Sequence, residues 1–333
     1  MHPNTNLLVP LEAIQVAAQR LLGVAVRTPL LPYPHVPRDV PGGTPGHLLV
    51  KPESLQPTGS FKIRGAYATI SALPAQRRAR GVIAHSSGNH AQAVAYAAAV
   101  VGCRTVVVVP ETAAELKVES ARSYGAQVVK VAPSLAARVS ATAELARQHG
   151  YAVIPPFDDP RVIAGQGTIG LEIAADCPEA DVVLVPVGGG GLISGIAAAI
   201  EATSPRTALV GVEPELAADA RDSLRTGTRV SWPAAQTART LADALRVEQV
   251  GELPFEHMRA YVDDIVTVTE GEIAAAVRRI ADDLRLIAEP GGAVAVAAYL
   301  YRRRELPPGD TYVSVLSGGN IAPAARAGLL GSG

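Results

Sequence analysis

Cysteine is scarce in this sequence. Its 333 residues contain only Cys103 and Cys177, and neither belongs to a CxxC pair or to a Cys/His spacing that binds zinc. Two isolated cysteines also cannot build the disulfide framework of a small secreted domain. The pattern excludes a zinc ribbon and a disulfide-stabilised module, and it favours reduced thiols in a cytoplasmic protein.

An excess of charge and long apolar runs are also missing. Charged residues make up 18% of the chain and the formal net charge is -1, so we expect no nucleic-acid partner. No apolar run approaches the length of a membrane span, and the opening MHPNTNLLVP lacks the features of a secretion signal, so we expect no membrane partner. With 48% hydrophobic residues the chain is too apolar for disorder, and it is long enough for two lobes.

Short β-rich runs alternate with Ala-rich stretches after an amphipathic helix expected around Leu11 to Leu22. This alternation predicts an α/β fold of two lobes, each with a helix-covered, mostly parallel sheet. The expected strands are apolar runs, mostly continuous, as is typical of strands buried on both faces. They are Val82 to His85, Val106 to Val109, Val128 to Val131, Val182 to Val187, Val210 to Glu213, Ile265 to Thr269 and Tyr312 to Leu316.

Pro-rich segments at Pro32 to Pro45 and Pro155 to Pro160 interrupt the alternation. We interpret the second as a crossing between lobes. The predicted division is a large domain of residues 1–75 and 155–330 and a small domain of residues 76–154.

A run of four glycines, Gly188 to Gly191, follows the strand expected at Val182 to Val187 and precedes a helical pattern through Leu192. Free backbone N–H groups at a helix N-terminus bind anions, so a phosphate is the expected ligand. A dinucleotide fingerprint is the competing interpretation, with Glu213 as the ribose-binding acid. The third glycine of G-x-G-x-x-G would fall on Ile193 or Ser194, so that spacing is not met.

Three other segments carry candidate chemistry. In SFKIRGAY, Lys62 stands between Phe61 and Ile63 at the start of a helical pattern, and partial desolvation would make its amine nucleophilic. In HSSGNHAQ, polar residues from His85 onward gather at a helix start, where they can cap the helix or bind a carboxylate. The third, SGGN from Ser317, follows the last expected strand and by itself indicates only a turn.

Taken in order, SFKIRGAY, SSGNHAQA, PFDDPRVIAGQGT, GGGGL, TLADAL, EPGGA and SGGN resemble the threonine/serine dehydratase and serine racemase group. These are pyridoxal-phosphate (PLP) enzymes of fold type II, and the match runs from about Arg27 to Asn320. The group's usual TIADG ends here in Ala244, which leaves the substrate open. Since the chain ends soon after Asn320, we expect no C-terminal regulatory domain.

The resemblance implies a role for each candidate residue. Lys62 would carry PLP as a Schiff base and act as the base at Cα. The other cofactor-binding residues would be Phe61, Asn89, Gly188, Gly189, Gly190, Gly191, Leu192 and Ser317. Substrate would be bound by Ser86, Ser87, Asn89 and His90, with Ser87 also a candidate catalytic group. Ser317 would face the ring nitrogen, and a hydroxyl there favours elimination over transamination.

The function implied is a PLP-dependent ammonia-lyase that converts L-threonine, L-serine or both to a 2-oxo acid and ammonia. Several alternatives stay open. A serine racemase would use Ser87 as a second acid/base group, and a 3-hydroxyaspartate dehydratase would need a cation that we do not identify. A dinucleotide-dependent oxidoreductase and a catalytically silent PLP-binding protein are the alternatives of other classes. Family members are commonly dimers, so we expect a homodimer.

A divalent cation is a further expectation from the resemblance. Metal-dependent members use an acid, a carbonyl four residues later and an acid six residues later, which here are Glu213, Ala217 and Asp219. Oxygen ligands suit Mg²⁺ or Ca²⁺. The alternative is a solvated acidic loop.

Overall fold

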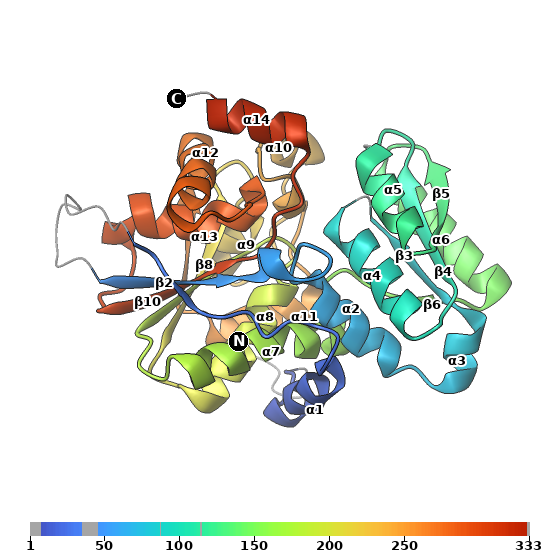
Figure 1. Ribbon diagram of the computed structural model, residues 1–333, viewed down its shortest axis with the longest axis horizontal. Helices are drawn as coiled ribbons and strands as arrows, with labels where there is room; N and C mark the ends of the chain where they lie inside the picture. The colour runs from blue at the N-terminus through green and yellow to red at the C-terminus, as the bar shows by residue number, and fades with distance from the viewer. Residues whose placement is uncertain (1–7, 35–45, 87, 114, 332–333) are drawn as a thin grey trace.

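The computed structural model describes residues 8–34, 46–86, 88–113 and 115–331. These residues form two β-sheets flanked by helices, with the smaller sheet at the right of Figure 1. The helices are α1 (Leu11–Leu21), α2 (Lys62–Ser71), α3 (Ala75–Arg80), α4 (Asn89–Val100), α5 (Glu115–Ser123), α6 (Leu135–His149), α7 (Pro160–Asp176), α8 (Gly191–Thr203), α9 (Asp219–Thr226), α10 (Ala234–Thr237), α11 (Glu252–Tyr261), α12 (Glu270–Arg279), α13 (Pro290–Tyr301) and α14 (Pro323–Gly331). Short helical turns are η2 (Glu53–Leu55), η3 (Asp243–Leu245), η4 (Ile280–Leu284) and η5 (Arg303–Glu305).

The larger sheet has six strands in the order β1-β2-β10-β7-β8-β9. Neighbouring strands are parallel except β1 and β2, which are antiparallel. The strands are β1 (Leu31–Pro32), β2 (His47–Pro52), β7 (Val182–Pro186), β8 (Ala208–Pro214), β9 (Asp264–Val268) and β10 (Thr311–Leu316).

Alternate side chains of the central strands enter two different cores. In β7, Val182 and Leu184 pack with residues of α12 and α13, whereas Val183 and Val185 pack with residues of α7, α8 and α11. Figure 1 shows these two groups of helices on opposite faces of the sheet. Burial on both faces explains why the strand sequences are continuously apolar rather than alternating.

The smaller sheet has four parallel strands in the order β5-β4-β3-β6. They are β3 (Val82–His85), β4 (Thr105–Pro110), β5 (Gln127–Val131) and β6 (Ala152–Val153). Ile63 and Ile70 of α2 belong to the core that α4 and β3 form in this lobe. Helix α2 therefore lies between the two sheets.

All seven expected strands are present, each within two residues of its expected bounds. Thr269 was expected to end β9 but instead caps α12, because its hydroxyl accepts the Glu272 N–H and the Glu272 carboxylate accepts the Thr269 N–H. Three described strands, β1, β2 and β6, were not among those expected, and β2 carries the fully buried Lys51. A buried lysine is exceptional in a strand, and its partner is distant in the sequence.

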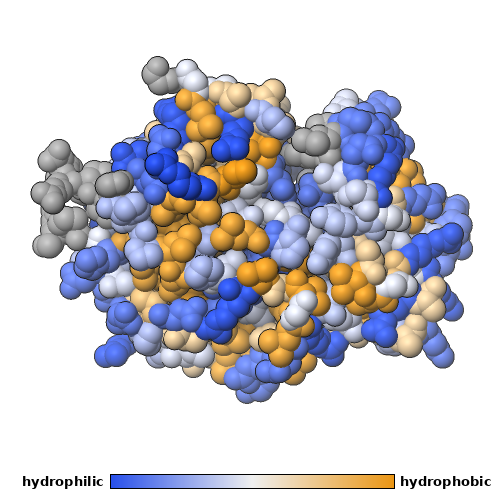
Figure 2. All heavy atoms as spheres, in the orientation of Figure 1, coloured by the Kyte–Doolittle hydropathy of each residue, from blue (hydrophilic) through white to orange (hydrophobic). Residues whose placement is uncertain are grey.

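The surface differs between the two lobes. Figure 2 shows hydrophobic residues reaching the surface over the large sheet and around α1, whereas the outer edge of the small lobe is mostly hydrophilic. In the described ranges, the helices are too short or too polar to cross a membrane.

Candidate active site

Two segments with predicted site residues meet beside the carboxyl ends of β2 and β10. Lys62 is the first residue of α2, and the N–H of the preceding Phe61 donates to the Ser317 carbonyl at 3.1 Å. Ser60 also forms an isolated bridge with Gly318. In parallel sheets this edge is where ligands bind, because loops and helix N-termini converge there.

Lys62 has an environment that favours a neutral amine. Its Nζ donates to the Pro156 carbonyl at 2.6 Å and lies 5.0 Å from the centre of the Phe61 ring. Burial lowers the pKa of Lys62 to about 8, because the charged ammonium loses solvation. An amine with this pKa can act as a nucleophile or a base near neutral pH.

The four glycines connect β7 to α8, as expected from the sequence. A Cβ on Gly189 would lie 2.2 Å from Cδ1 of Phe157, and one on Gly191 would lie 2.9 Å from the Phe157 Cα. Gly190 has φ of +88°, which other residues rarely adopt. Close packing therefore requires glycine here. The loop precedes α8, and the N-terminus of a helix is a place where an anion binds well.

The segment from Pro156 to Asp158 joins the amine to this loop. The Pro156 carbonyl accepts from Lys62, and the next residue, Phe157, packs against Gly189 and Gly191. Asp158 then caps α11 by accepting the N–H groups of Glu252 and Leu253 at 2.9 and 3.0 Å. The sequence predicted a crossing between lobes at Pro155 to Pro160, but it indicated no site role for Pro156, Phe157 or Asp158.

Asn89 joins the small lobe to the large one. Its Nδ2 donates to Oε1 of Glu289 at 2.6 Å, and its Oδ1 accepts from Nδ2 of Asn320 at 2.8 Å. Glu289 is 3% exposed and precedes α13 in the EPGGA motif. One N–H of Asn89 is not used in these bonds, and it could serve a ligand.

Ser86 and His90, also predicted to bind substrate, lie at the same helix N-terminus. The Ser86 hydroxyl accepts the Gly88 N–H at 3.2 Å, and Ser87 lies outside the described residues. His90 is 4% exposed, and its Nε2 lies 2.8 Å from the Ile154 carbonyl. Burial and the nearby Lys62 charge lower the pKa of His90 to about 3, so the ring is neutral and Nε2 is the donor. His90 therefore brings no positive charge to the site.

The acidic segment after β8 is buried rather than solvated. Glu213 and Asp219 are both 0% exposed, and Ala217 is 1% exposed. Glu213 accepts the N–H groups of Ala220 and Arg221, but within the described ranges neither carboxylate oxygen of Asp219 has a hydrogen-bond partner. Burial and the Asp219 charge raise the pKa of Glu213 well above its usual range. Two facing acids, one of them unpartnered, fit a bound cation.

Two further observations bear on this acidic segment. In the described part of the chain, no cluster of three or more His, Cys, Asp or Glu residues could hold a metal ion, so a cation here would need backbone oxygens or water in addition. Burial raises the pKa of Asp219, and the nearby Val250 backbone opposes this rise. A Cβ on Gly190 would meet Cγ2 of the same Val250 at 2.9 Å. Val250 therefore lies beside both Asp219 and Gly190 of the glycine loop.

Ala244, the departure from the family pattern, packs against backbone beside the site. Its Cβ lies 3.1 Å from the position of a Cβ on Gly291, in the first turn of α13. The Cα of the neighbouring Leu245 lies 3.2 Å from the position of a Cβ on Gly188. This turn therefore contacts both the glycine loop and the motif that holds Glu289.

These residues bring together an amine with a lowered pKa and a glycine loop suited to an anion. PLP offers an aldehyde and a phosphate, so the two features fit that cofactor. A Cβ on Gly189 or Gly191 would clash with Phe157, so only glycine fits this loop. The Lys62 amine is partly neutral near neutral pH.

Comparisons with known proteins agree with this fit. Residues 22–318 match the family model of the pyridoxal-phosphate dependent enzymes. The chain is 42% identical to an L-threonine ammonia-lyase of Thermotoga maritima over 94% of this chain and 76% of that protein. It is 40% identical to an L-threo-3-hydroxyaspartate ammonia-lyase of Saccharomyces cerevisiae over 81% of this chain and 82% of that protein. The structure of a serine racemase from Dictyostelium discoideum superimposes with a TM-score of 0.87 and 36% sequence identity. The superposition covers 94% of this chain and 99% of the racemase chain.

Proposed function

This chain belongs to the pyridoxal-phosphate-dependent enzymes, and from that premise we propose that it is an ammonia-lyase acting on L-threonine, L-serine or both. The products would be ammonia and 2-oxobutanoate or pyruvate. The observation that carries the proposal is the Lys62 amine, which has a pKa of about 8 and is held on the Pro156 carbonyl. The similarity to an L-threonine ammonia-lyase over 94% of the chain supports threonine as a substrate.

We propose that the cofactor is held by residues at the carboxyl edge of the large sheet. Lys62 would bind it covalently, Phe61 would pack beside its ring, and Gly188 to Leu192 would hold its phosphate. Asn89 would bond the 3′-oxygen on the ring, and Ser317 would face the ring nitrogen. When bound, PLP supplies an electron sink for the charge left at Cα after a proton is removed.

The chain's own residues would position the substrate and move its proton. Lys62, neutral in part near pH 7, would take the proton from Cα, and the Pro156 carbonyl would orient the amine through its hydrogen bond. Ser86, Ser87 and Asn89 would bind the substrate carboxylate at the N-terminus of α4. His90, being neutral, would act by hydrogen bonding alone.

The acidic segment supports a second part of the proposal. Glu213, the Ala217 carbonyl and Asp219 would hold Mg²⁺ or Ca²⁺, and the unpartnered oxygens of Asp219 support this assignment. The ion would be structural and would act on the glycine loop through Val250. A homodimer, a cytoplasmic location and the domain division at residues 75 and 155 remain predictions from the sequence.

The proposal is tested by measuring oxo acid from purified protein given L-threonine, L-serine, D-serine or threo-3-hydroxyaspartate. Oxo acid from L-threonine or L-serine is expected. If only threo-3-hydroxyaspartate gives oxo acid, a 3-hydroxyaspartate dehydratase, like the Saccharomyces cerevisiae relative, is the better assignment. D-serine formed from L-serine without oxo acid would identify a racemase, and no product from any of the four would contradict an enzyme of this group.

A further inference from the structure

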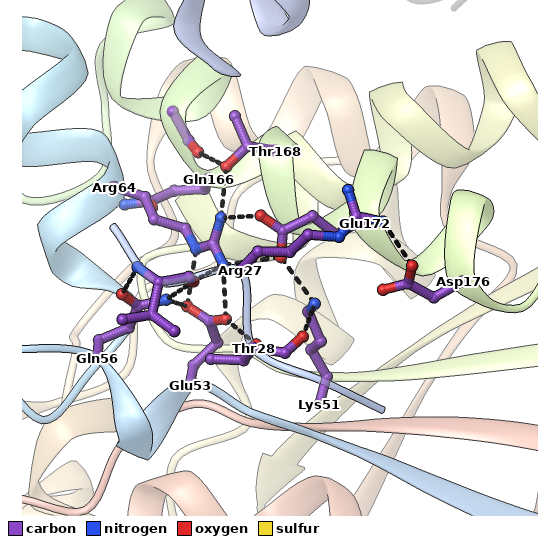
Figure 3. Close-up of polar contacts among 12 residues, drawn as sticks. Arg27, Thr28, Lys51, Glu53, Gln56, Arg64, Gln166, Thr168, Glu172 and Asp176 are labelled. Carbon is purple, nitrogen blue, oxygen red and sulfur yellow. Dashed lines mark hydrogen bonds and ion pairs between the residues drawn. The ribbon is translucent and has the colours of Figure 1, made fainter. Parts of the chain in front are cut away.

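Four charged side chains form a buried network behind the first turn of α2. Lys51, Glu53 and Arg64 are each at most 1% exposed, and Glu172 is 14% exposed at its side chain (Figure 3). The set contains two cations and two carboxylates, so its charges balance.

Arg64 is the centre of this network. Its Nε and Nη2 donate to the two carboxylate oxygens of Glu53, each at 2.8 Å. Its Nη1 and Nη2 donate to the two oxygens of Glu172 at 2.6 and 2.9 Å. Thr168 Oγ1 at 3.0 Å and the Val26 carbonyl at 3.1 Å accept further bonds. The planar fork of arginine satisfies two carboxylates at once, and lysine has no equivalent geometry.

The network connects elements that are distant in the sequence. Glu53 belongs to η2 after β2, Glu172 and Thr168 belong to α7, and Arg64 stands two residues after Lys62. Lys51 of β2 completes the set through its 2.7 Å ion pair with Glu172. Buried ion pairs add little net stability because desolvation is costly, so their clearest effect is to fix one geometry.

A second set of contacts holds the same turn against α7. The Gly65 N–H donates to Oε1 of Gln166 at 3.1 Å, which satisfies a donor in the first turn of α2. A Cβ on Gly165 would lie only 2.6 Å from the Gly65 Cα, so the two helices are in backbone contact. The first turn of α2 therefore has little freedom to shift along α7.

The opposite side of α7 is packed as closely against α8. A Cβ on Gly195 of α8 would lie 2.3 Å from the Ile163 carbonyl oxygen. Since α8 begins at the glycine loop and α2 begins at Lys62, α7 determines the separation between these two parts of the site.

We propose that Arg64 and Glu172 are positioning residues, which lock the first turn of α2 onto α7 and so set the place of Lys62 relative to the glycine loop. This inference rests on the proposed cofactor-binding role of Lys62. The network does not contact the reacting atoms, and it acts only through the backbone of α2.

The test compares Arg64→Lys with a matched control, Tyr299→Phe. Arg64→Lys keeps the charge balance but loses the fork. Tyr299 is 1% exposed and its hydroxyl donates to the Gly46 carbonyl, so Tyr299→Phe removes a buried bond remote from α2. For each protein we would measure the melting temperature, the apparent Kd of PLP for the apoprotein, the amount of borohydride-trapped adduct on Lys62, and kcat and KM.

Arg64→Lys is expected to weaken PLP binding at least about tenfold and to lower kcat about 100-fold, because an error near 1 Å at a reacting group has effects of this size. Its KM should change by no more than about twofold. Tyr299→Phe should leave the Kd of PLP and kcat within about twofold of wild type, even if its melting temperature falls.

Should Arg64→Lys fail to fold, Thr168→Val serves instead, because it removes only one acceptor from the guanidinium, and a several-fold weaker PLP affinity is expected. Wild-type values for the folded Arg64→Lys, or for Thr168→Val in its place, would overturn the positioning role. Equal losses in Tyr299→Phe would overturn it too. If the wild type itself forms no trapped adduct at Lys62, the proposed function fails, and this inference fails with it. If the wild type forms the adduct and Arg64→Lys behaves like wild type, only this inference fails.

Discussion

The ring of Phe157 lies so close to Gly189 that a Cβ on this glycine would be 2.2 Å from Cδ1 of the ring. Phe157 directly follows Pro156, whose carbonyl accepts the hydrogen bond from Lys62. One dipeptide therefore contacts both the amine and the anion-binding loop, and a change on one side is transmitted to the other.

Gly189→Ala should weaken cofactor binding, because the new methyl group forces Phe157 or the loop to move. Such overpacking costs about 1–3 kcal/mol, which corresponds to a rise of about 5-fold to 150-fold in the Kd of PLP. Titration of the apoprotein with PLP measures this Kd. The control is Gly271→Ala in α12, where the nearest atom to the new Cβ is 4.0 Å away. Equal affinity in Gly189→Ala and wild type would contradict the packing argument.

Lys62→Ala should abolish both the borohydride-reducible cofactor adduct and oxo-acid production, because the reactive amine is removed. Lys51 cannot replace it, since that amine is fully buried and paired with Glu172 at 2.7 Å. The matched control is Lys130→Ala, which removes a surface lysine paired with Glu115. Retention of the adduct and of turnover in Lys62→Ala would show that the assignment of this lysine is wrong.

The rate of cofactor attachment to the apoprotein should rise with pH and level off above about pH 8. Burial lowers the pKa of Lys62 to about 8, so the reactive neutral fraction grows through that pH. At pH 7 about a tenth of the amine would be neutral, against far less than a hundredth for an ordinary lysine. Stopped-flow absorbance of PLP mixed with the apoprotein gives the profile, and a midpoint near pH 10 would contradict a desolvated Lys62.

Removal of divalent cations should lower both the melting temperature and turnover, and Mg²⁺ or Ca²⁺ should restore them. An ion that binds only the folded state at 100 times its Kd adds about 2.7 kcal/mol to the free energy of unfolding. Asp219→Asn removes a buried, unpartnered carboxylate, so in chelator this variant should be at least as stable as wild type. With added Mg²⁺ only the wild type should gain stability. If neither chelator nor added ions change the melting temperature or turnover of the wild type, the acidic segment does not bind a metal ion.

The sequence alone determined the two-sheet α/β architecture, because continuous apolar runs such as Val182 to Val187 can only be buried on both faces. It also indicated the local chemistry of the glycine loop and of Lys62, since a helix N-terminus and a hydrophobic flank act over a few residues. The strand β2 escaped prediction, because Lys51 is tolerable in a strand only when Glu172, 121 positions later, compensates its charge.

Only the tertiary structure decided which residues hold these groups in place. Phe157 and Gly189, Asn89 and Glu289, and Arg64 and Glu172 meet across different helices and loops. No local periodicity encodes such pairs, because each contact depends on how α2, α7, α8 and α13 pack. Desolvation works in the same way, since the lowered pKa of Lys62 and the neutral ring of His90 arise from burial that the whole fold creates.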